Sequence, residues 1–213
     1  IEFDAISFMW RHGIRCIPRP VSVNAQFGFA LYEYVKGREV DSANVNAADL
    51  DQLVQFASEL KTLSGLRESA ALPFAADACV SINTIYRQIE DRRQRLGQQH
   101  GNETLDPSLA QFLNEAFTPA FLAIKEKGSK ELGDNASSCE LPPDCQTLSP
   151  SDFGFHNTLR RPSGDLTFLD FEYFGRDDPA KMIADFLQHP AQALSEATKC
   201  EFARRMLQMF SSD

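Results

Sequence analysis

The stretch SPSDFGFHNTLRRPSGDLTFLDFEYFGRDDPA, residues 149–180, decides the fold of this chain. It places an acid and an amide five residues apart, at Asp152 and Asn157. A second acid, Asp170, follows Asn157 by thirteen residues. Asp170 ends the apolar run of Leu166, Phe168 and Leu169, which indicates that its side chain emerges from the end of a strand.

Residues 157–161 and 166–170 predict a short hairpin, because a Pro-Ser-Gly-Asp turn separates two strand-like segments. Asp170 ends the second strand, a rigid position that suits a metal ligand. A carboxylate at Asp152 can accept a proton from a bound hydroxyl, and the amide oxygen of Asn157 is a ligand suited to Mg²⁺. Each residue alone is also an ordinary turn or capping residue. Together, the spacing and the strand context favour the arrangement that phosphoryl-transfer enzymes use.

The rest of the chain predicts an α+β fold in which helices dominate. Apolar residues at helical spacing predict helices at 2–12, 46–64, 77–96, 107–127, 179–188 and 194–210. Pro119 should kink or split the fourth of these helices. Two short strands are expected at 21–23 and 29–35, and a polar loop at 128–147.

Composition excludes several classes of protein. The chain has 213 residues, 43% of them hydrophobic, which suffices for one domain or for one large lobe with part of another. Its net charge of -9 argues against nucleic acid as a partner, because phosphate contacts need clustered cations. The five cysteines are odd in number and scattered, which favours a reduced, cytoplasmic protein. No apolar run is long enough to span a membrane.

Residues 148–187 resemble the aminoglycoside phosphotransferase / choline kinase family, which has a protein-kinase-like fold. The catalytic loop of that family reads roughly His-Gly-Asp, four residues, Asn, and an Asp-Phe-Glu triplet follows some dozen residues later. Asp152, Asn157 and the triplet that begins at Asp170 match these motifs. The resemblance implies that Asp152 is the catalytic base and that Asn157 and Asp170 bind Mg²⁺, with Glu172 as the third residue of the triplet.

The resemblance extends to the first part of the chain. LYEYVKG, residues 31–37, resembles the hinge between lobes, where backbone groups of Glu33, Tyr34 and Val35 would receive the adenine of ATP (or the base of GTP). IEFDAISFMW resembles the N-lobe helix whose Glu pairs with a phosphate-anchoring Lys, and Glu2 matches that Glu. A solvated first-turn residue favoured by the helix dipole is the alternative for Glu2. The implied division is a partial N-lobe with its hinge at 1–37, made of one helix and two strands, and a mostly helical C-lobe at 38–213.

Two departures from the family are visible. Pro150 and Ser151 stand where the family has His-Gly, a departure that concerns the local support of the loop and not the base itself. The chain also contains no Gly-x-Gly, and its first lysine is Lys36, in the expected hinge. In the family the phosphate loop and the anchoring lysine precede the Glu-bearing helix. We therefore expect the chain to be an incomplete kinase that is inactive by itself.

The resemblance implies an enzyme that moves the γ-phosphoryl group of ATP, with Mg²⁺, to a hydroxyl of a small molecule such as an amino sugar, an amine alcohol or a sugar. A non-catalytic, kinase-like binding module is the alternative. The missing phosphate loop favours that alternative, whereas the intact Asp152, Asn157 and Asp170 oppose it. A metal-dependent hydrolase using Asp152, His156 and Asp170 is a third interpretation, and it has few histidine ligands.

Overall fold

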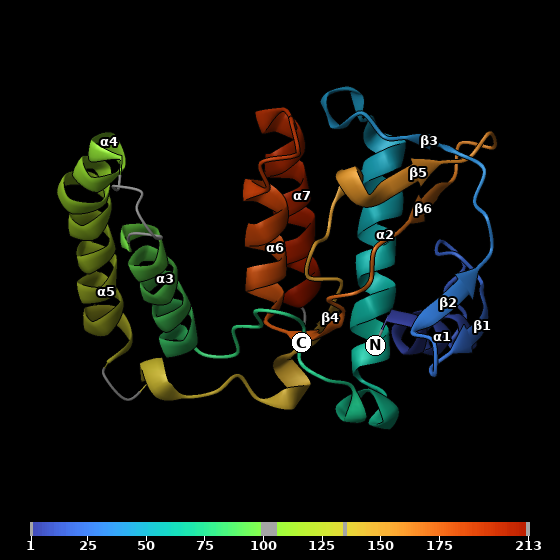
Figure 1. Cartoon of the computed structure of the whole chain (residues 1–213), viewed down its shortest axis with the longest axis horizontal. Helices are drawn as coiled ribbons and strands as arrows, with labels where there is room; N and C mark the ends of the chain where they lie inside the picture. The colour runs from blue at the N-terminus through green and yellow to red at the C-terminus, as the bar shows by residue number, and fades with distance from the viewer. Residues whose placement is uncertain (1, 99–105, 134–135, 212–213) are drawn as a thin grey trace. The chain divides into compact units, whose positions relative to one another are not determined.

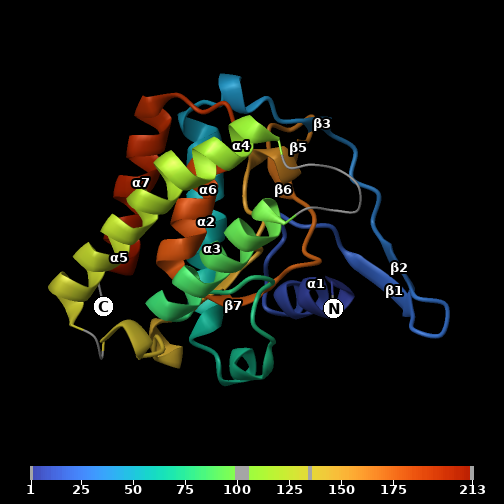
Figure 2. The same cartoon turned by 60° about the vertical axis from the view of Figure 1, so that its left-hand side comes forward.

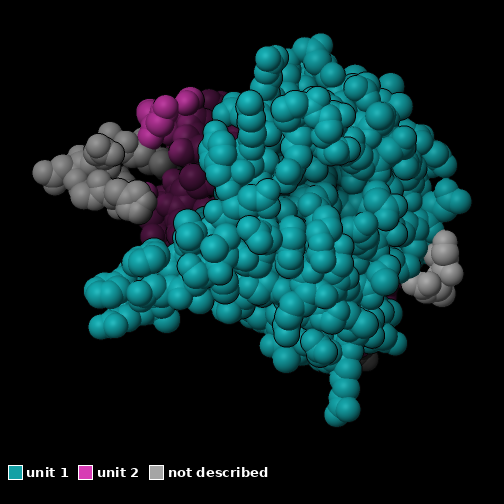
Figure 3. All heavy atoms as spheres, turned by 90° about the vertical axis from the view of Figure 1, so that its right-hand side faces the viewer, with its two compact units in different colours: residues 1–78, 142–213 teal, residues 79–141 magenta. Residues whose placement is uncertain are grey.

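The computed structural model describes residues 2–98, 106–133 and 136–211 (Figure 1). The chain divides into two compact units, coloured in Figure 3: Ile1–Ala78 with Pro142–Asp213, and Cys79–Leu141. The lobe boundary expected at residue 37 lies inside the first unit and stays a prediction. Among the described residues, no helix combines the length and the apolar character needed to cross a bilayer.

The first unit combines four α-helices with seven short strands. Its helices are α1 (Glu2–Arg11), α2 (Ala47–Ser64), α6 (Pro179–Gln188) and α7 (Glu196–Phe210), and its strands are β1 (Pro20–Asn24), β2 (Phe29–Tyr32), β3 (Arg38–Glu39), β4 (Thr147–Ser149), β5 (Thr158–Arg160), β6 (Leu166–Phe168) and β7 (Gly175–Asp177). Four 3₁₀ turns complete it: η1 (Ser42–Asn44), η2 (Arg67–Ala71), η5 (Pro143–Cys145) and η6 (Phe155–Asn157).

The strands form three small sheets, all with antiparallel pairing. β1 pairs with β2, β4 pairs with β7, and β5 lies between β3 and β6. The hairpin expected from the sequence is β5–β6, with Thr158 opposite Phe168 and Arg160 opposite Leu166. The loop that carries Asp152 and Asn157, called the acid/amide loop below, leads into β5, and Asp170 follows β6. Because the strands are antiparallel, this register places the loop and the segment after β6 at the same end of the hairpin.

Helix α2 is the centre of the core of the first unit, and Figures 1 and 2 show it running beside α7 and the β5–β6 hairpin. Its inward residues Leu53, Phe56 and Leu60 are fully buried. Phe56 stacks on Phe168 with ring centroids 4.5 Å apart and meets Phe171 edge-on at 6.1 Å. Aromatic packing of this kind fixes the hairpin and the segment after it to a rigid helix.

The second unit is helical. It contains α3 (Ile82–Gly97), α4 (Pro107–Gln111), α5 (Thr118–Leu132) and the 3₁₀ turn η4 (Ala136–Ser138), with the π-helical η3 (Phe112–Phe117) joining α4 to α5. The predicted interruption at Pro119 is confirmed, since the π-helical turn ends immediately before α5. A proline inside a helix removes a backbone donor, and a wider turn accommodates this loss.

Several element boundaries differ from the sequence prediction. The helix expected from residue 77 begins at Ile82, where the Ser81 side chain accepts a hydrogen bond from the Thr84 N–H. The loop expected from 128 was wrong at its start, because α5 continues to Leu132. The strand expected at 29–35 ends at Tyr32. The short strands β3, β4 and β7 were not predicted.

Candidate active site

The acid/amide loop brings Asp152 and Asn157 into direct contact. The amide nitrogen of Asn157 donates to Asp152 Oδ2 at 2.9 Å and to the Asp152 carbonyl at 3.1 Å. Because the nitrogen is engaged in this way, the amide oxygen is the atom of Asn157 that can serve a metal ion.

Hydrogen bonds hold this loop in place around a strained residue, Ser151. Ser151 adopts a positive φ of 69°, an unusual conformation for a residue that is not glycine. Its N–H donates to Ser149 Oγ at 3.0 Å, and its hydroxyl donates to the Ala76 carbonyl at 2.9 Å. At the other end of the loop, Thr158 Oγ1 donates to the Gly154 carbonyl at 2.9 Å. These contacts support the loop locally at both of its ends.

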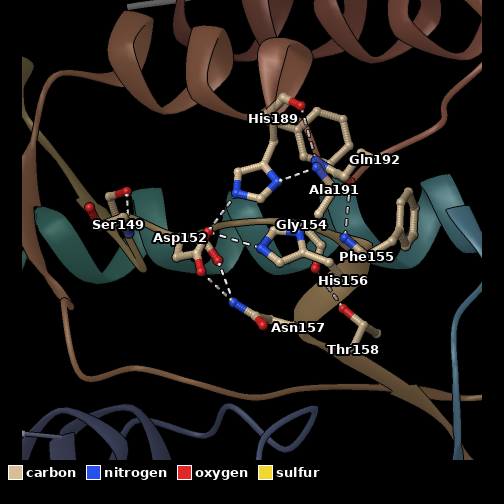
Figure 4. Close-up of polar contacts among 12 residues, drawn as sticks. Ser149, Asp152, Gly154, Phe155, His156, Asn157, Thr158, His189, Ala191 and Gln192 are labelled. Carbon is tan, nitrogen blue, oxygen red and sulfur yellow. Dashed lines mark hydrogen bonds and ion pairs between the residues drawn. The ribbon is translucent and has the colours of Figure 1, made fainter. Parts of the chain in front are cut away.

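Two imidazoles face the Asp152 carboxylate, as Figure 4 shows. His156 Nε2 lies 2.9 Å from Asp152 Oδ1, and His189 Nε2 lies 3.1 Å from the same oxygen. The two rings stack with their centroids 4.0 Å apart and an interplanar angle of 4°. Asp152 is therefore contacted by donors on both of its oxygens.

Opposing effects act on the pKa of Asp152. Burial raises it, but hydrogen bonds from His156 and Asn157, together with electrostatic interactions with His156 and His189, outweigh burial and hold the pKa below its ordinary value. The carboxyl therefore stays ionised throughout the neutral range. An ionised carboxylate can orient a hydroxyl and accept its proton.

Asp170 follows β6 and faces the same region. The Leu169 N–H donates to the Asn157 carbonyl at 2.9 Å, which ties the two segments together. Asp170 has a φ of 63°, and such strained residues cluster at functional sites. Burial raises its pKa, and the negative charges of Glu172 and Asp152 raise it further.

These features fit a magnesium site. The amide oxygen of Asn157 and the carboxylate of Asp170 are hard oxygen ligands from adjoining segments. The carboxylates of Asp152 and Glu172 already disfavour the charge on Asp170, so a divalent cation beside Asp170 would offset that repulsion.

The structure places Glu2 beside the second motif. Its carboxylate accepts a hydrogen bond from the Phe171 N–H at 3.4 Å and one from the Tyr32 hydroxyl at 3.5 Å. Glu2 is half-buried, which differs from a fully solvated first-turn residue. This contact brings the start of α1 next to Phe171, the residue after Asp170, and the role of Glu2 stays a prediction.

The expected hinge continues after β2 without a helix or strand as far as β3. The Glu33 N–H donates to the Arg19 carbonyl at 2.9 Å, and its carboxylate lies 4.0 Å from Arg161. The side chain of Tyr34 is 88% exposed, whereas Val35 is buried. Neither observation tests the assignment of these three residues to adenine binding, which stays a prediction.

Sequence reasoning missed His189 and the residue that holds it, Gln192. His189 follows α6, 37 residues after Asp152, and no spacing in the sequence connects them. His156 was expected as a structural neighbour of Asn157 or as a residue of a metal-dependent hydrolase, and not as a hydrogen-bond partner of Asp152. The one available signal was the missing His-Gly before Asp152, which left the support of the carboxylate to be found elsewhere.

Comparisons with known proteins identify the fold. No protein-family model matches the chain, and no curated protein matches it in sequence. A spectinomycin phosphotransferase, solved with ADP and spectinomycin, matches with a TM-score of 0.61 and 13% identity over 100% of this chain. An aminoglycoside phosphotransferase bound to gentamicin matches with a TM-score of 0.57, 17% identity and coverage of 100%. The choline kinase of Streptococcus pneumoniae matches with a TM-score of 0.51, 14% identity and coverage of 99%.

This chain spans 64% of the spectinomycin phosphotransferase, 66% of the gentamicin-bound enzyme and 60% of the choline kinase. All three neighbours are small-molecule phosphotransferases by name. At these identities the likeness concerns the fold. The chain thus has the mostly helical α+β, protein-kinase-like fold of the aminoglycoside phosphotransferases and choline kinases.

Proposed function

We propose that the protein is an ATP-dependent phosphotransferase that moves a γ-phosphoryl group to a hydroxyl of a small molecule. The observation that carries this proposal is the joint placement of Asp152, Asn157 and Asp170. Asn157 contacts the Asp152 carboxylate, and the N–H of Leu169, the residue before Asp170, donates to the Asn157 carbonyl, which supports a shared site. The shared fold of small-molecule kinases supports it.

In this proposal each residue has one task. Asp152 accepts a hydrogen bond from the acceptor hydroxyl, orients the oxygen and takes its proton as the bond to phosphorus forms. Asn157 and Asp170 hold Mg²⁺, which when bound would neutralise charge on the nucleotide phosphates. The nucleotide base is received by backbone groups of Glu33, Tyr34 and Val35. Glu2 is positioned to pair with a lysine.

The acceptor belongs to the class of amino sugars, amine alcohols and sugars. Spectinomycin, streptomycin and gentamicin are bound by the structural neighbours. The net charge of -9 favours a cationic acceptor, because the field of an acidic protein attracts cations.

The test is a screen for transfer from ATP to a panel of aminoglycosides, amines and sugars, made with the full-length gene product and Mg²⁺. We expect Asp152→Asn to lower kcat by about 10³-fold or more while the thermal unfolding midpoint stays near that of the parent, since general-base catalysis contributes roughly 10²–10⁴. Transfer that is unchanged in Asp152→Asn would rule out the assigned base.

A matched control is Asp165→Asn, in the turn of the β5–β6 hairpin. The Asp165 carboxylate accepts a hydrogen bond from the Ser163 hydroxyl at 2.7 Å and lies at the opposite end of the hairpin from the acid/amide loop. Its kcat should equal that of the parent. Nucleotide binding without transfer to any acceptor of the panel would favour the non-catalytic binding module.

A further inference from the structure

We propose that His189 is a positioning residue of this site. With His156 it holds Oδ1 of Asp152, so that Oδ2 is the oxygen that takes the proton of the acceptor hydroxyl. The two histidines that contact Asp152 Oδ1 are called the imidazole clamp below, and the fold itself brings them there. Its role in proton transfer rests on the proposed function.

Both imidazoles must donate to the carboxylate. His156 Nε2 and His189 Nε2 lie 2.9 Å and 3.1 Å from Asp152 Oδ1. An ionised carboxylate accepts hydrogen bonds and has none to donate. Each Nε2 atom therefore carries the proton, and the two N–H groups converge on one oxygen (Figure 4).

The backbone fixes the same tautomer of His189 independently. The Ala191 N–H donates to His189 Nδ1 at 3.2 Å, so Nδ1 offers a lone pair and holds no proton. In the neutral ring the proton is then on Nε2, where it faces Asp152. Two separate contacts thus require one arrangement of the His189 ring.

The surroundings of His156 favour the same tautomer. Its Nδ1 atom is buried and has no hydrogen-bond partner among the described residues. An N–H at that atom would be a buried donor without an acceptor, which is more costly than an unused lone pair. The proton of the neutral ring therefore belongs on Nε2, which again faces Asp152.

A metal site is the competing interpretation of these residues. One ligand atom each from Asp152, His156 and His189 lies within 4.8 Å of the others, a spacing at which a zinc ion could bind. A histidine that binds metal through Nε2 donates its Nδ1–H to a second partner. His189 does the reverse, because its Nδ1 accepts from Ala191. The structure therefore favours hydrogen bonds over a metal in this triad.

Gln192 connects the segment of His189 to the catalytic loop. Its side-chain oxygen accepts from the Phe155 N–H at 3.0 Å, and its side-chain nitrogen donates to the Phe186 carbonyl at 3.0 Å. Gln192 is buried, so both bonds are protected from water. The end of α6 and the loop therefore form one rigid unit, and His189 reaches Asp152 from a fixed position.

The clamp makes the two oxygens of Asp152 unequal. Oδ1 accepts from two imidazoles, whereas Oδ2 accepts only from the Asn157 amide among the side chains that the structure describes. Oδ2 therefore keeps more capacity for a further hydrogen bond. This is the oxygen to which we assign the acceptor hydroxyl.

The test is NMR spectroscopy of the ¹⁵N-labelled chain with ¹³C-labelled aspartate, for the parent, His189→Gln and His189→Leu. Glutamine keeps an N–H donor, and leucine removes it. In the parent we expect both imidazoles as Nε2–H tautomers. The ¹³Cγ shift of Asp152 should stay near that of the parent in His189→Gln and move in His189→Leu. Thermal unfolding identifies any variant that does not fold.

Three outcomes would overturn the clamp: an Nδ1–H tautomer of His189 in the parent, an Asp152 shift unaffected by leucine in a folded variant, or micromolar binding of added Zn²⁺ that is lost in both variants. The first is measured on the folded parent alone and does not depend on the stability of a variant.

A kinetic measurement tests the positioning role in the full-length gene product with an acceptor from the screen. His189→Leu should lower kcat about 10- to 100-fold with KM for ATP unchanged, because misplacement of a catalytic group costs up to about 10²-fold. His189→Gln should recover kcat to within about threefold. Equal loss in both variants would overturn the role. The NMR result stands apart from these rates, so an intact clamp in a protein without transfer would contradict only the proposed function.

Discussion

At the scale of single residues, the ion pair between Asp49 and Arg160 joins α2 to the hairpin that carries the site. Asp49 is 1% exposed, and Arg160 Nη1 donates to its carboxylate. The same carboxylate accepts the Asn46 N–H at 2.9 Å and so closes the capping box of α2. Burial raises the pKa of Asp49, but the bonds from Arg160 and Asn46 outweigh it and lower the pKa below its ordinary value.

Asp49→Asn should destabilise the fold by about 2 kcal/mol near neutral pH. It keeps an oxygen for the helix cap and removes the charge beside Arg160. Losing one partner of a fully buried pair costs roughly 3–5 kcal/mol, but the Arg160 side chain is 33% exposed and can be hydrated. Urea unfolding would measure the difference. Asp51→Asn is the matched control on the same helix. Asp51 is 66% exposed and pairs with Arg205, and surface ion pairs of this kind contribute about 0–1 kcal/mol.

The effect of Asp49 should depend on pH with a definite sign. A carboxyl whose pKa is lowered by folding binds fewer protons in the native state, so its contribution is complete above the unfolded pKa, near 3.8. The contribution is lost as pH falls from there towards the lower, native pKa. The gap between the parent and Asp49→Asn should therefore narrow only below about pH 4. A gap that is constant through that range would contradict the charge-based account.

At the scale of elements, β7 passes so close to a neighbouring segment that only glycine fits at residue 175. A Cβ atom on Gly175 would lie 2.4 Å from the Ala75 nitrogen and 2.6 Å from the Pro73 carbonyl oxygen. These are backbone atoms, held by the Ala75 N–H bond to the Arg176 carbonyl at 3.0 Å. The segment therefore cannot yield without breaking its pairing with β7.

Gly175→Ala should cost about 3 kcal/mol or more, at or above the upper end of the roughly 1–3 kcal/mol of overpacked cores. Chemical denaturation followed by circular dichroism would measure it. Gly65→Ala is a suitable comparison, since a Cβ there meets only the Thr62 carbonyl oxygen, at an ordinary 3.6 Å. Equal stability of Gly175→Ala and Gly65→Ala would contradict this prediction, because it would mean that the close approach of β7 to residues 73–75 does not affect the free energy of unfolding.

Elements with strong local signals could be predicted from the sequence. Helix α6 has the predicted bounds, because Asp178 caps it and Pro179 occupies its first turn. The strands β4 and β7 could not be predicted, since three residues show no period and their partners lie some 28 residues apart. In the candidate site, His189 could not be predicted for the same reason. It reaches Asp152 through tertiary packing, which no local pattern reports.

At the scale of the whole molecule, the described chain contains the proposed base and metal ligands, whereas its sequence offers little that could grip phosphates. It has no Gly-x-Gly, and no lysine precedes Lys36. In kinases of this fold the phosphates are held by a Gly-rich loop and a lysine, and electrostatic stabilisation of the transferring group supplies most of the catalysis. The carboxylate of Glu2 contacts the Phe171 N–H, and no lysine bond to it is found among the described residues.

We therefore expect the 213-residue chain alone to transfer phosphate at least about 10³-fold more slowly than kinases of the usual 1–100 s⁻¹, because the missing contacts act on the charge of the transition state. The measurement is transfer from radiolabelled ATP to the acceptor panel with and without Mg²⁺. Asp152→Asn serves as the background, since it removes the base and leaves the nucleotide contacts in place. Magnesium-dependent transfer by the chain alone, well above that background, would contradict the prediction, because it would mean that this chain holds the phosphates without a Gly-rich loop and without a lysine before Lys36.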